Sequence, residues 1–342
     1  MQPCSASHAP NVSPQTGLSV PLVRVEDLCV HFPISRNITL KAVDGVSFDV
    51  HSNEVFGLIG ESGSGKSTVG RTIVALQAAT EGRVVLEGED ISSLSGAALR
   101  RKRRDYQIVF QDPAGALNPR MTILQSLREP LRIQGKLSRA EQDEVALECL
   151  GLVGLRPEHA KRYAHELSGG QKQRVNIARV LTMKPKLLVC DEAVAALDVS
   201  IQAEIVNLFD KLQKELGLAY LFISHDLSVV SHVSHRIAVM YLGRLVEVGT
   251  VDQIMSEPLH PYTRALLRSR PVPVPASMRT RTRPALTGEI PSALTPPSGC
   301  RFRTRCQFAQ ARCAEEAPAL REMRAGQQVA CHFAGETTGG VQ

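Results

Sequence analysis

The nine residues from Gly60 to Thr68 constrain this chain more than any other part of its sequence. They follow the pattern GxxxxGK[ST] of a phosphate-binding loop, reading Gly60, Glu61, Ser62, Gly63, Ser64, Gly65, Lys66, Ser67 and Thr68. Glycine adopts the backbone angles that turn successive N–H groups toward one anion, and a helix beginning near Lys66 adds its positive N-terminal end. Lys66 supplies charge for the β- and γ-phosphates of a nucleotide, and Ser67 supplies a hydroxyl ligand for Mg²⁺. By itself the loop is compatible with kinases, GTPases and many ATPases.

The length and composition of the chain are those of a soluble globular protein with one large domain and one smaller one. Its 342 residues are 43% apolar and 22% charged. No apolar run approaches the roughly 18 residues of a membrane-spanning helix. Residues 1–21 are polar and lack the features of a secretion signal, so we predict a disordered leader. We therefore expect a cytoplasmic protein, with any transport pore supplied by another chain.

Residues 22–269 are predicted to form an α/β domain, a parallel sheet wrapped by helices, because short buried strands alternate with helices. The predicted strands lie at 54–60, 83–87, 106–111, 186–191 and 219–224, and the predicted helices at 66–77, 139–150, 169–183 and 201–216. Alternating polarity over 23–32 and 43–50 predicts two antiparallel strands, and 236–248 predicts a closing hairpin. Helical periodicity from about 112 to 165 indicates an inserted helical subdomain.

The composition changes after Ser269. Residues 270–298 are predicted to be an extended linker rich in Pro and Arg, followed by a small module at 299–335. Ten arginines and one acid lie between Arg264 and Arg312, a balance that attracts nucleic acid or an anionic membrane face. No stacking aromatics interleave these arginines, so we expect a solvated basic tail near lipid headgroups and no nucleic-acid partner.

A second motif, Leu-Ser-Gly-Gly-Gln at 167–171, resembles the signature of ATP-binding-cassette (ABC) proteins. In that family the signature of one subunit closes over the ATP held by the phosphate loop of another. The resemblance implies an ABC ATPase cassette, with an antiparallel β subdomain and a helical subdomain added to the parallel core. It also implies that nucleotide is contacted by Ser168, Gly169, Gly170 and Gln171.

Further residues match catalytic positions of the ABC family. A buried apolar run ends in Asp191 and Glu192, and the resemblance implies that Asp191 holds Mg²⁺ while Glu192 is the general base for the attacking water. Gln111 matches the glutamine that senses Mg²⁺ and the γ-phosphate, and His225 matches the histidine that contacts the γ-phosphate. Phe32 matches the aromatic that stacks on adenine, with a core aromatic as the alternative interpretation.

More specific motifs resemble the oligopeptide, dipeptide and nickel importer group of ABC ATPases. These motifs lie at Val109–Pro113, Leu117–Arg120, Leu197–Gln202 and His260–Leu267. The resemblance extends from about Val23 to Phe333 and implies the ATPase subunit of a peptide importer at the cytoplasmic face of the inner membrane. It implies a second ATPase subunit, identical or homologous, two transmembrane permeases and indirectly a substrate-binding protein. Nickel or another small solute is the alternative cargo. A soluble ABC protein acting on DNA or ribosomes is the rival class, although such proteins usually carry two cassettes or long coiled-coil insertions.

Four of the eight cysteines fall in the predicted C-terminal module, namely Cys300, Cys306, Cys313 and Cys331. A reducing cytoplasm disfavours structural disulfides, and a small segment with little core gains stability from a metal. The spacing lacks the CxxC pairs of structural zinc sites. It resembles the C-terminal cysteine motif of the importer group, some members of which hold a [4Fe–4S] cluster. A cluster, zinc and no metal remain the alternatives, and a cluster would make the module a redox sensor for the ATPase.

Overall fold

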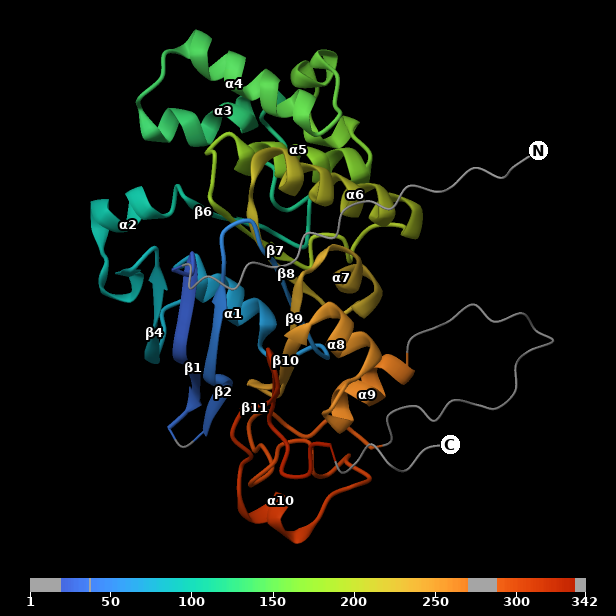
Figure 1. Ribbon diagram of the computed structural model, residues 1–342. Helices are drawn as coiled ribbons and strands as arrows, with labels where there is room; N and C mark the ends of the chain where they lie inside the picture. Colours follow the sequence, from blue (N-terminus) through green and yellow to red (C-terminus); the bar gives the residue numbers. More distant parts are fainter. Residues whose placement is uncertain (1–19, 37, 270–287, 336–342) are drawn as a thin grey trace, which may run out of the picture.

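The computed structural model describes residues 20–36, 38–269 and 288–335, whose elements form two sheets packed with helices (Figure 1). The smaller sheet is antiparallel, in the order β2-β1-β4-β5, and consists of β1 (Val23–Ser35), β2 (Ile38–Val50), β4 (Glu81–Leu86) and β5 (Glu89–Asp90). The antiparallel strands predicted at 23–32 and 43–50 are confirmed, as a longer pair. The predicted leader lies outside the described residues except for its last two positions, and so does the 270–287 part of the predicted linker.

The larger sheet has the order β11-β12-β10-β9-β3-β8-β7-β6. Its strands are β3 (Val55–Ile59), β6 (Tyr106–Val109), β7 (Leu187–Asp191), β8 (Ala219–Ser224), β9 (Arg236–Tyr241), β10 (Arg244–Thr250), β11 (Arg321–Arg324) and β12 (Gln327–Val329). The strands from β6 to β9 run parallel, whereas β10, β12 and β11 continue the sheet antiparallel. Every residue of β3, β7 and β8 is buried, as in parallel strands covered on both faces. The predicted parallel core and its closing hairpin are confirmed, except that the strand predicted at 83–87 is β4 of the smaller sheet, where it pairs antiparallel with β1.

Helices build a hydrophobic core on each face of the larger sheet. Between the two sheets lies α1 (Lys66–Ile73), whose Val69 and Ile73 are fully buried in a core shared with both. The other core is formed with α5 (Gly169–Leu181), α6 (Val199–Leu216) and α7 (Leu227–Val233). Further helices are α2 (Gly96–Lys102), α8 (Val251–Ser256), α9 (Pro261–Arg268) and α10 (Ala311–Glu315). Among the residues described, no helix is both long enough and apolar enough to span a membrane.

Between β6 and α5 the chain leaves the sheet and forms α3 (Ile123–Gln134) and α4 (Arg139–Leu152), which lie at the top of Figure 1. Each helix starts with a reciprocal capping box, formed by Thr122 with Gln125 and by Ser138 with Glu141. The helices expected within 112–165 are therefore present. They pack on each other and on α5, so this segment is tied to the helix that carries the signature.

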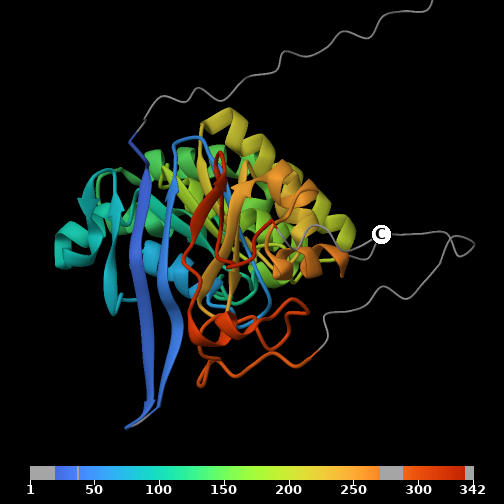
Figure 2. The ribbon, with the colours of Figure 1, turned by 60° about the horizontal axis from the view of Figure 1, so that its bottom comes forward.

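The C-terminal segment, residues 288–335, packs against the larger sheet. β12 pairs antiparallel with β10, and β11 pairs with β12. The ring of Phe302 is buried and meets Tyr241 of β9 edge-on, with ring centres 5.3 Å apart. Figure 2 shows this segment in red beside the long β1–β2 pair. The predicted module at 299–335 thus shares a sheet and a core with the predicted domain at 22–269.

Candidate nucleotide site

The residues predicted to carry the chemistry gather where the parallel strands of the larger sheet end. The register places the carboxyl ends of β3, β8, β7 and β6 side by side in that order. The phosphate loop follows β3 and His225 follows β8, while β7 ends at Asp191 and is followed by Glu192, and Gln111 comes after β6. Ligands of open α/β sheets bind outside the carboxyl ends of the strands, so this edge is the candidate nucleotide site.

Lys66 is folded back into the phosphate loop. Its ammonium group donates to the carbonyl oxygen of Gly60 at 2.8 Å and to that of Glu61 at 2.9 Å, with the hydroxyl of Ser64 at 3.4 Å. The side chain is almost fully buried, and this burial lowers the pKa of Lys66 against the pull of nearby carboxylates. The loop therefore surrounds one cation with its own oxygens, and an incoming phosphate would exchange for them.

Two glycines allow the loop to pack tightly against its neighbours. Gly65 has φ of 102°, and a Cβ there would lie 2.1 Å from the carbonyl oxygen of Ala42 on β2. A Cβ at Gly60 would lie 2.1 Å from the carbonyl oxygen of Met240 on β9. Both clashes involve backbone atoms that cannot move aside, so these positions require glycine for packing as well as for phosphate approach.

Ser67 and Asp191 meet in the position expected for a Mg²⁺ site. The hydroxyl of Ser67 donates to a carboxylate oxygen of Asp191 at 2.6 Å, and the Arg71 guanidinium lies 3.7 Å from the other oxygen. Burial raises the pKa of Asp191, and the bond from Ser67 opposes that rise. A hydroxyl and a buried carboxylate are hard oxygen ligands, so this pair fits Mg²⁺.

Glu192 and His225 face each other across the ends of β7 and β8. The His225 Nδ1 atom lies 3.5 Å from a carboxylate oxygen of Glu192. Glu192 has φ of 49° and donates its N–H to the carbonyl oxygen of Ile223 at 3.0 Å. A positive φ is costly for a residue with a side chain and is often retained at functional positions. The two side chains are close enough together to contact one water molecule jointly.

Gln111 and Phe32 occupy less constrained positions. The strand predicted to end at Gln111 ends at Val109, so Gln111 lies exposed in the loop that leads toward α3. Phe32 lies on β1 opposite Leu40 of β2, half-buried and packed against the core between the sheets. Its role in adenine stacking stays a prediction, because this position is compatible both with stacking on adenine and with a purely structural core aromatic.

The signature forms the start of α5. Ser168 is the N-cap of this helix and accepts from the N–H of Gln171 at 3.3 Å, while the Gln171 side chain accepts from the N–H of Ser168 at 3.1 Å. Gly170 is buried, and a Cβ there would meet a methyl group of Ile201 at 2.6 Å. Gly169, the first residue of α5, is exposed, so the N-terminal end of this helix is open to a ligand or partner.

All four C-terminal cysteines line one small pocket with His260 and Phe302. They are free thiols, and Cys313 is the most buried of them. Burial raises the pKa of Cys300 to about 11 and also raises those of Cys306 and Cys331. No three of these sulfurs lie within 4.8 Å of one another.

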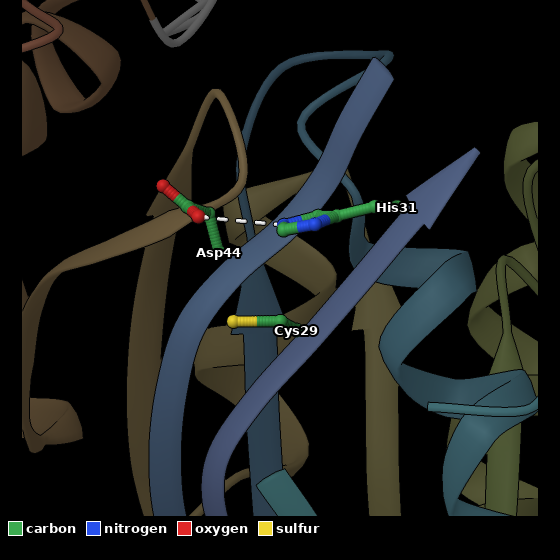
Figure 3. Close-up of side chains that lie close together, drawn as sticks. All are labelled: Cys29, His31 and Asp44. Carbon is green, nitrogen blue, oxygen red and sulfur yellow. Dashed lines mark ion pairs between the residues drawn. The ribbon is translucent and has the colours of Figure 1, made fainter. Parts of the chain in front are cut away.

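Another group of ligating side chains lies on the β1–β2 pair, where Cys29, His31 and Asp44 bring one ligand atom each within 4.8 Å (Figure 3). His31 Nε2 lies 3.5 Å from an Asp44 oxygen. A metal cation does not fit this group well, because Asp44 is already ion-paired with the side chains of Lys41, Arg244 and Arg301. Asp44 instead joins β2, β10 and the C-terminal segment.

Two arginines of the C-terminal segment contradict the solvated basic tail expected from the sequence. Arg301 is buried and bonds to Asp44, and the Arg305 side chain is 4% exposed and pairs with Glu61 of the phosphate loop. The expectation was wrong for these residues because it weighed composition alone. Their positions next to Cys300 and Cys306 were the available signal, because these two cysteines are partly buried and pack against the core.

Comparisons with known proteins show which family the chain belongs to. The family described as ABC transporter matches residues 43–195, and the family described as oligopeptide/dipeptide transporter, C-terminal region matches residues 246–313. The putative oligopeptide transport ATP-binding protein YkfD of Bacillus subtilis is 48% identical, over 92% of this chain and 96% of its own length. A putative peptide import ATP-binding protein of Brucella ovis is 51% identical, over 91% of this chain and 97% of its own.

A solved structure also matches. The ATP-binding cassette MJ0796, in a dimeric post-hydrolysis state bound to ADP and Pi, is 31% identical with a TM-score of 0.61, covering 67% of this chain and 98% of that one. The chain therefore belongs to the family of ATP-binding proteins of ABC-type oligopeptide and dipeptide transporters, and it is an ATPase of that class.

Proposed function

We propose that this chain energises a peptide importer by hydrolysing ATP at the edge of the larger sheet. The observation that carries the proposal is the tandem of an ABC cassette and an oligopeptide-transporter C-terminal region in one chain. Its relatives YkfD and the Brucella ovis protein carry names of peptide transport or import. Nickel or another small solute is the alternative cargo.

The proposed chemistry divides among the gathered residues. Lys66 and the N–H groups of the phosphate loop bind the β- and γ-phosphates, and Gln111 senses the γ-phosphate from its exposed loop. Ser67 and Asp191 would hold Mg²⁺, which when bound supplies charge neutralisation to the phosphates. Glu192 takes a proton from the attacking water. His225, whose Nδ1 lies 3.5 Å from a carboxylate oxygen of Glu192, orients that water and the γ-phosphate.

The signature would act on nucleotide held by a second cassette. Ser168 and Gly169 stand at the start of α5, a helix that lies apart from α1, the helix that follows the phosphate loop (Figure 1). A helix N-terminus favours an anionic group, so this end suits the γ-phosphate of a partner's ATP. The dimeric MJ0796 structure supports a pair of cassettes. The partner is either a second copy or a homologue.

The helical segment would pass the nucleotide state to two permease subunits at the cytoplasmic face of the membrane, with a substrate-binding protein acting indirectly through them. Gln111 lies in the loop that connects β6 to this segment, so a shift at the γ-phosphate reaches α3 along the chain. Exposed apolar side chains in this part of the molecule, Ile133, Leu147 and Tyr163, are available for such contacts.

For the four cysteines we propose a [4Fe–4S] cluster in preference to zinc. Zn–S bonds of about 2.3 Å put the sulfurs of a tetrahedral site roughly 3.8 Å apart. The four sulfurs line one pocket, but no three of them lie within 4.8 Å of one another, which suits a larger polynuclear centre better than one zinc ion. Such a centre supplies cross-linking of the segment and a redox-active group. Iron and sulfide analysis of anaerobically purified protein tests this, and zinc at one equivalent without iron contradicts it.

Capture of the trapped protein from membranes tests the transport function. Glu192→Gln protein is incubated with ATP, purified with its partners and analysed by mass spectrometry, with Lys66→Ala protein as the matched control. We expect two multi-span permeases and an ATPase partner in the trapped sample, with a weaker yield of that partner in the control. Recovery of ribosomal or nucleic-acid proteins without a permease would overturn the proposal.

A further inference from the structure

The C-terminal segment reaches into the phosphate loop through one buried ion pair. The Arg305 guanidinium donates to both carboxylate oxygens of Glu61, at 2.7 and 3.1 Å, and to the hydroxyl of Tyr241 at 3.4 Å. The Arg305 side chain is 4% exposed and that of Glu61 is 20% exposed. Bidentate pairing in a shielded place fixes direction as well as distance, so Glu61 is held in one orientation.

Glu61 passes that orientation on to the residues that bind phosphate. Its carbonyl oxygen accepts from the ammonium of Lys66 at 2.9 Å. Its N–H donates to the hydroxyl of Tyr262 on α9 at 3.0 Å. The second residue of the loop is therefore held on its side chain by Arg305, on its N–H by Tyr262 and on its carbonyl by Lys66.

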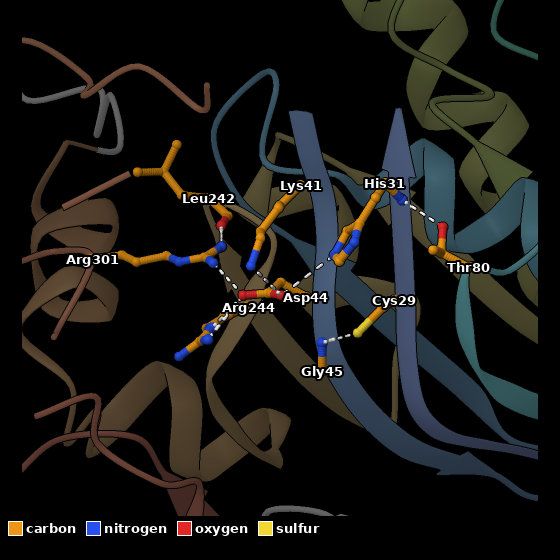
Figure 4. Close-up of polar contacts among 9 residues, drawn as sticks. All are labelled: Cys29, His31, Lys41, Asp44, Gly45, Thr80, Leu242, Arg244 and Arg301. Atoms are coloured by element: carbon orange, nitrogen blue, oxygen red, sulfur yellow. Dashed lines mark hydrogen bonds and ion pairs between the residues drawn. The ribbon is translucent and has the colours of Figure 1, made fainter. Parts of the chain in front are cut away.

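A second set of contacts connects the same segment with the loop. Its first part is the hydrogen bonds that Arg301 donates to the carbonyl oxygen of Leu242 and to Asp44 (Figure 4). The next residue in the β9–β10 turn, Gly243, donates its N–H to the carbonyl oxygen of Ser64 at 2.9 Å and accepts from the N–H of Asp44 at 2.9 Å. Arg301 thus fixes the β9–β10 turn, and this turn contacts the phosphate loop at Ser64.

We infer that Arg305, assisted by Arg301, is a positioning residue through which the C-terminal cysteine segment sets the affinity of the phosphate loop for ATP. The inference rests on the proposed role of that loop in ATP binding. Arg305 precedes Cys306 and Arg301 follows Cys300, so a change at the cysteines, by metal binding or oxidation, displaces both arginines. Coupling of this kind is reciprocal, so bound ATP also changes the environment of the cysteines.

The charge of Glu61 predicts the direction in which loss of Arg305 changes the affinity for ATP. Without Arg305 the Glu61 carboxylate remains beside the phosphate loop with no cation on its outer side. A triphosphate then meets an uncompensated negative charge as well as a loop that is less well held, so its affinity falls. Removing the Glu61 charge in addition relieves the repulsion, and the affinity recovers in part. A purely structural role for the ion pair predicts no such recovery.

The experiment measures the binding of a fluorescent ATP analogue to the full-length protein, together with the melting temperature without nucleotide. Arg305→Ala is expected to raise the Kd about tenfold, within the usual range of coupling between sites. Arg305→Lys, which keeps the charge but not the fork, should raise the Kd less. The matched control is Arg303→Ala, because the side-chain hydrogen bonds of Arg303 go to Ser298 of its own segment and none of them reaches the phosphate loop among the described residues, so the Kd should be unchanged.

Two further variants complete the test. Arg305→Ala combined with Glu61→Gln is expected to bind more tightly than Arg305→Ala alone. Cys306→Ser is expected to raise the Kd in the presence of Arg305 and to have no added effect on Arg305→Ala. Tenfold weaker binding by Arg303→Ala, or unchanged binding by Arg305→Ala and Arg305→Lys, overturns the inference. Equal weakening of the single and double variants with a lowered melting temperature also overturns it. Wild-type protein that binds no ATP analogue would instead refute the ATP-binding assignment.

Discussion

The two glycine-rich helix starts of this molecule, at α1 and at α5, are built in opposite ways. The N-cap of α1 is Gly65, which is in the left-handed conformation and provides no side-chain cap, so the first N–H groups of the helix are open to an anion. The N-cap of α5 is Ser168, whose capping box with Gln171 satisfies the N–H groups of these two residues from within the chain and leaves Gly169 exposed at the helix start. From this difference we propose that α1 binds phosphate within this chain, whereas the start of α5 is stabilised by its own cap and contacts nucleotide bound by a partner.

Stopping the chemistry while leaving both helix starts intact should have the largest effect. Glu192→Gln is expected to lower ATP hydrolysis by about a hundredfold or more, since general bases contribute that much, and to leave ATP binding near the wild-type level. Phosphate release and equilibrium binding measure the two properties. Glu215→Gln, at an exposed surface position of α6, is the control and should not change either. Hydrolysis near the wild-type rate in Glu192→Gln would mean that another group is the base.

The next largest effect should follow from closing the open start of α1. Gly65→Ala forces a side chain into φ of 102° and against the backbone of Ala42 at 2.1 Å, so we expect a loss of about 2 kcal/mol or more in unfolding free energy and weaker ATP binding. Denaturant unfolding and nucleotide titration measure both. Gly63→Ala is the matched control, because its φ of 77° is also positive but its Cβ would meet nothing within 4 Å. Equal losses in the two variants would show that packing against Ala42 is unimportant.

Removing the cap of α5 tests whether Ser168 acts only as a helix cap or also in hydrolysis. Ser168→Ala is expected to cost about 1 kcal/mol in unfolding free energy, as loss of an N-cap does, and to leave ATP binding by the isolated chain unchanged. Ser138→Ala removes the equivalent cap of α4 and should cost a similar amount. Only Ser168→Ala should also slow hydrolysis in the assembled transporter. If both variants slowed it equally, the signature serine would have no role beyond its own helix.

The smallest effect concerns the carboxylate that joins the sheets to the C-terminal segment. Burial disfavours the charged form of Asp44, but the bond from Arg244 and the charge of Arg301 outweigh it and hold the pKa below 3.8. The folded state thus binds this proton less tightly than the unfolded chain does. Its contribution is present above about pH 4 and is lost as the pH falls through the lowered pKa.

We therefore expect Asp44→Asn to be less stable near neutral pH and to lose less stability on acidification below about pH 4. Melting temperatures of both proteins across that range measure the difference. Asp49→Asn is the control, because Asp49 is paired with Arg24 at an exposed position. Identical acid sensitivity in wild-type protein and Asp44→Asn would contradict the assigned pKa direction.

Much of the nucleotide site could be predicted from the sequence because its residues follow strands that are recognisable locally. The apolar runs before Gly60, Asp191 and His225 define β3, β7 and β8, and parallel strands bring their carboxyl ends to one edge. The end of β6 was predicted two residues too late, since Phe110 and Gln111 continue the pattern while the backbone already leaves the sheet.

The contacts of the C-terminal segment could not be predicted in the same way. Arg305 and Glu61 lie 244 residues apart, and no local pattern relates them. The pairing of β12 with β10 likewise depends on how the chain returns after the linker, which periodicity does not record. Composition described these arginines as surface charge, whereas tertiary packing buried two of them against acids of the nucleotide domain.

The central claim, that the start of α5 acts on nucleotide bound by another chain, is tested most directly by photo-cross-linking in the trapped complex. Ser168 is replaced by p-benzoylphenylalanine in Glu192→Gln protein, and the complex is irradiated with and without ATP. We expect an ATP-dependent cross-link to the phosphate loop of the partner ATPase, identified by peptide mass. A cross-link to the phosphate loop of the same chain, or a yield that does not depend on ATP, would contradict it.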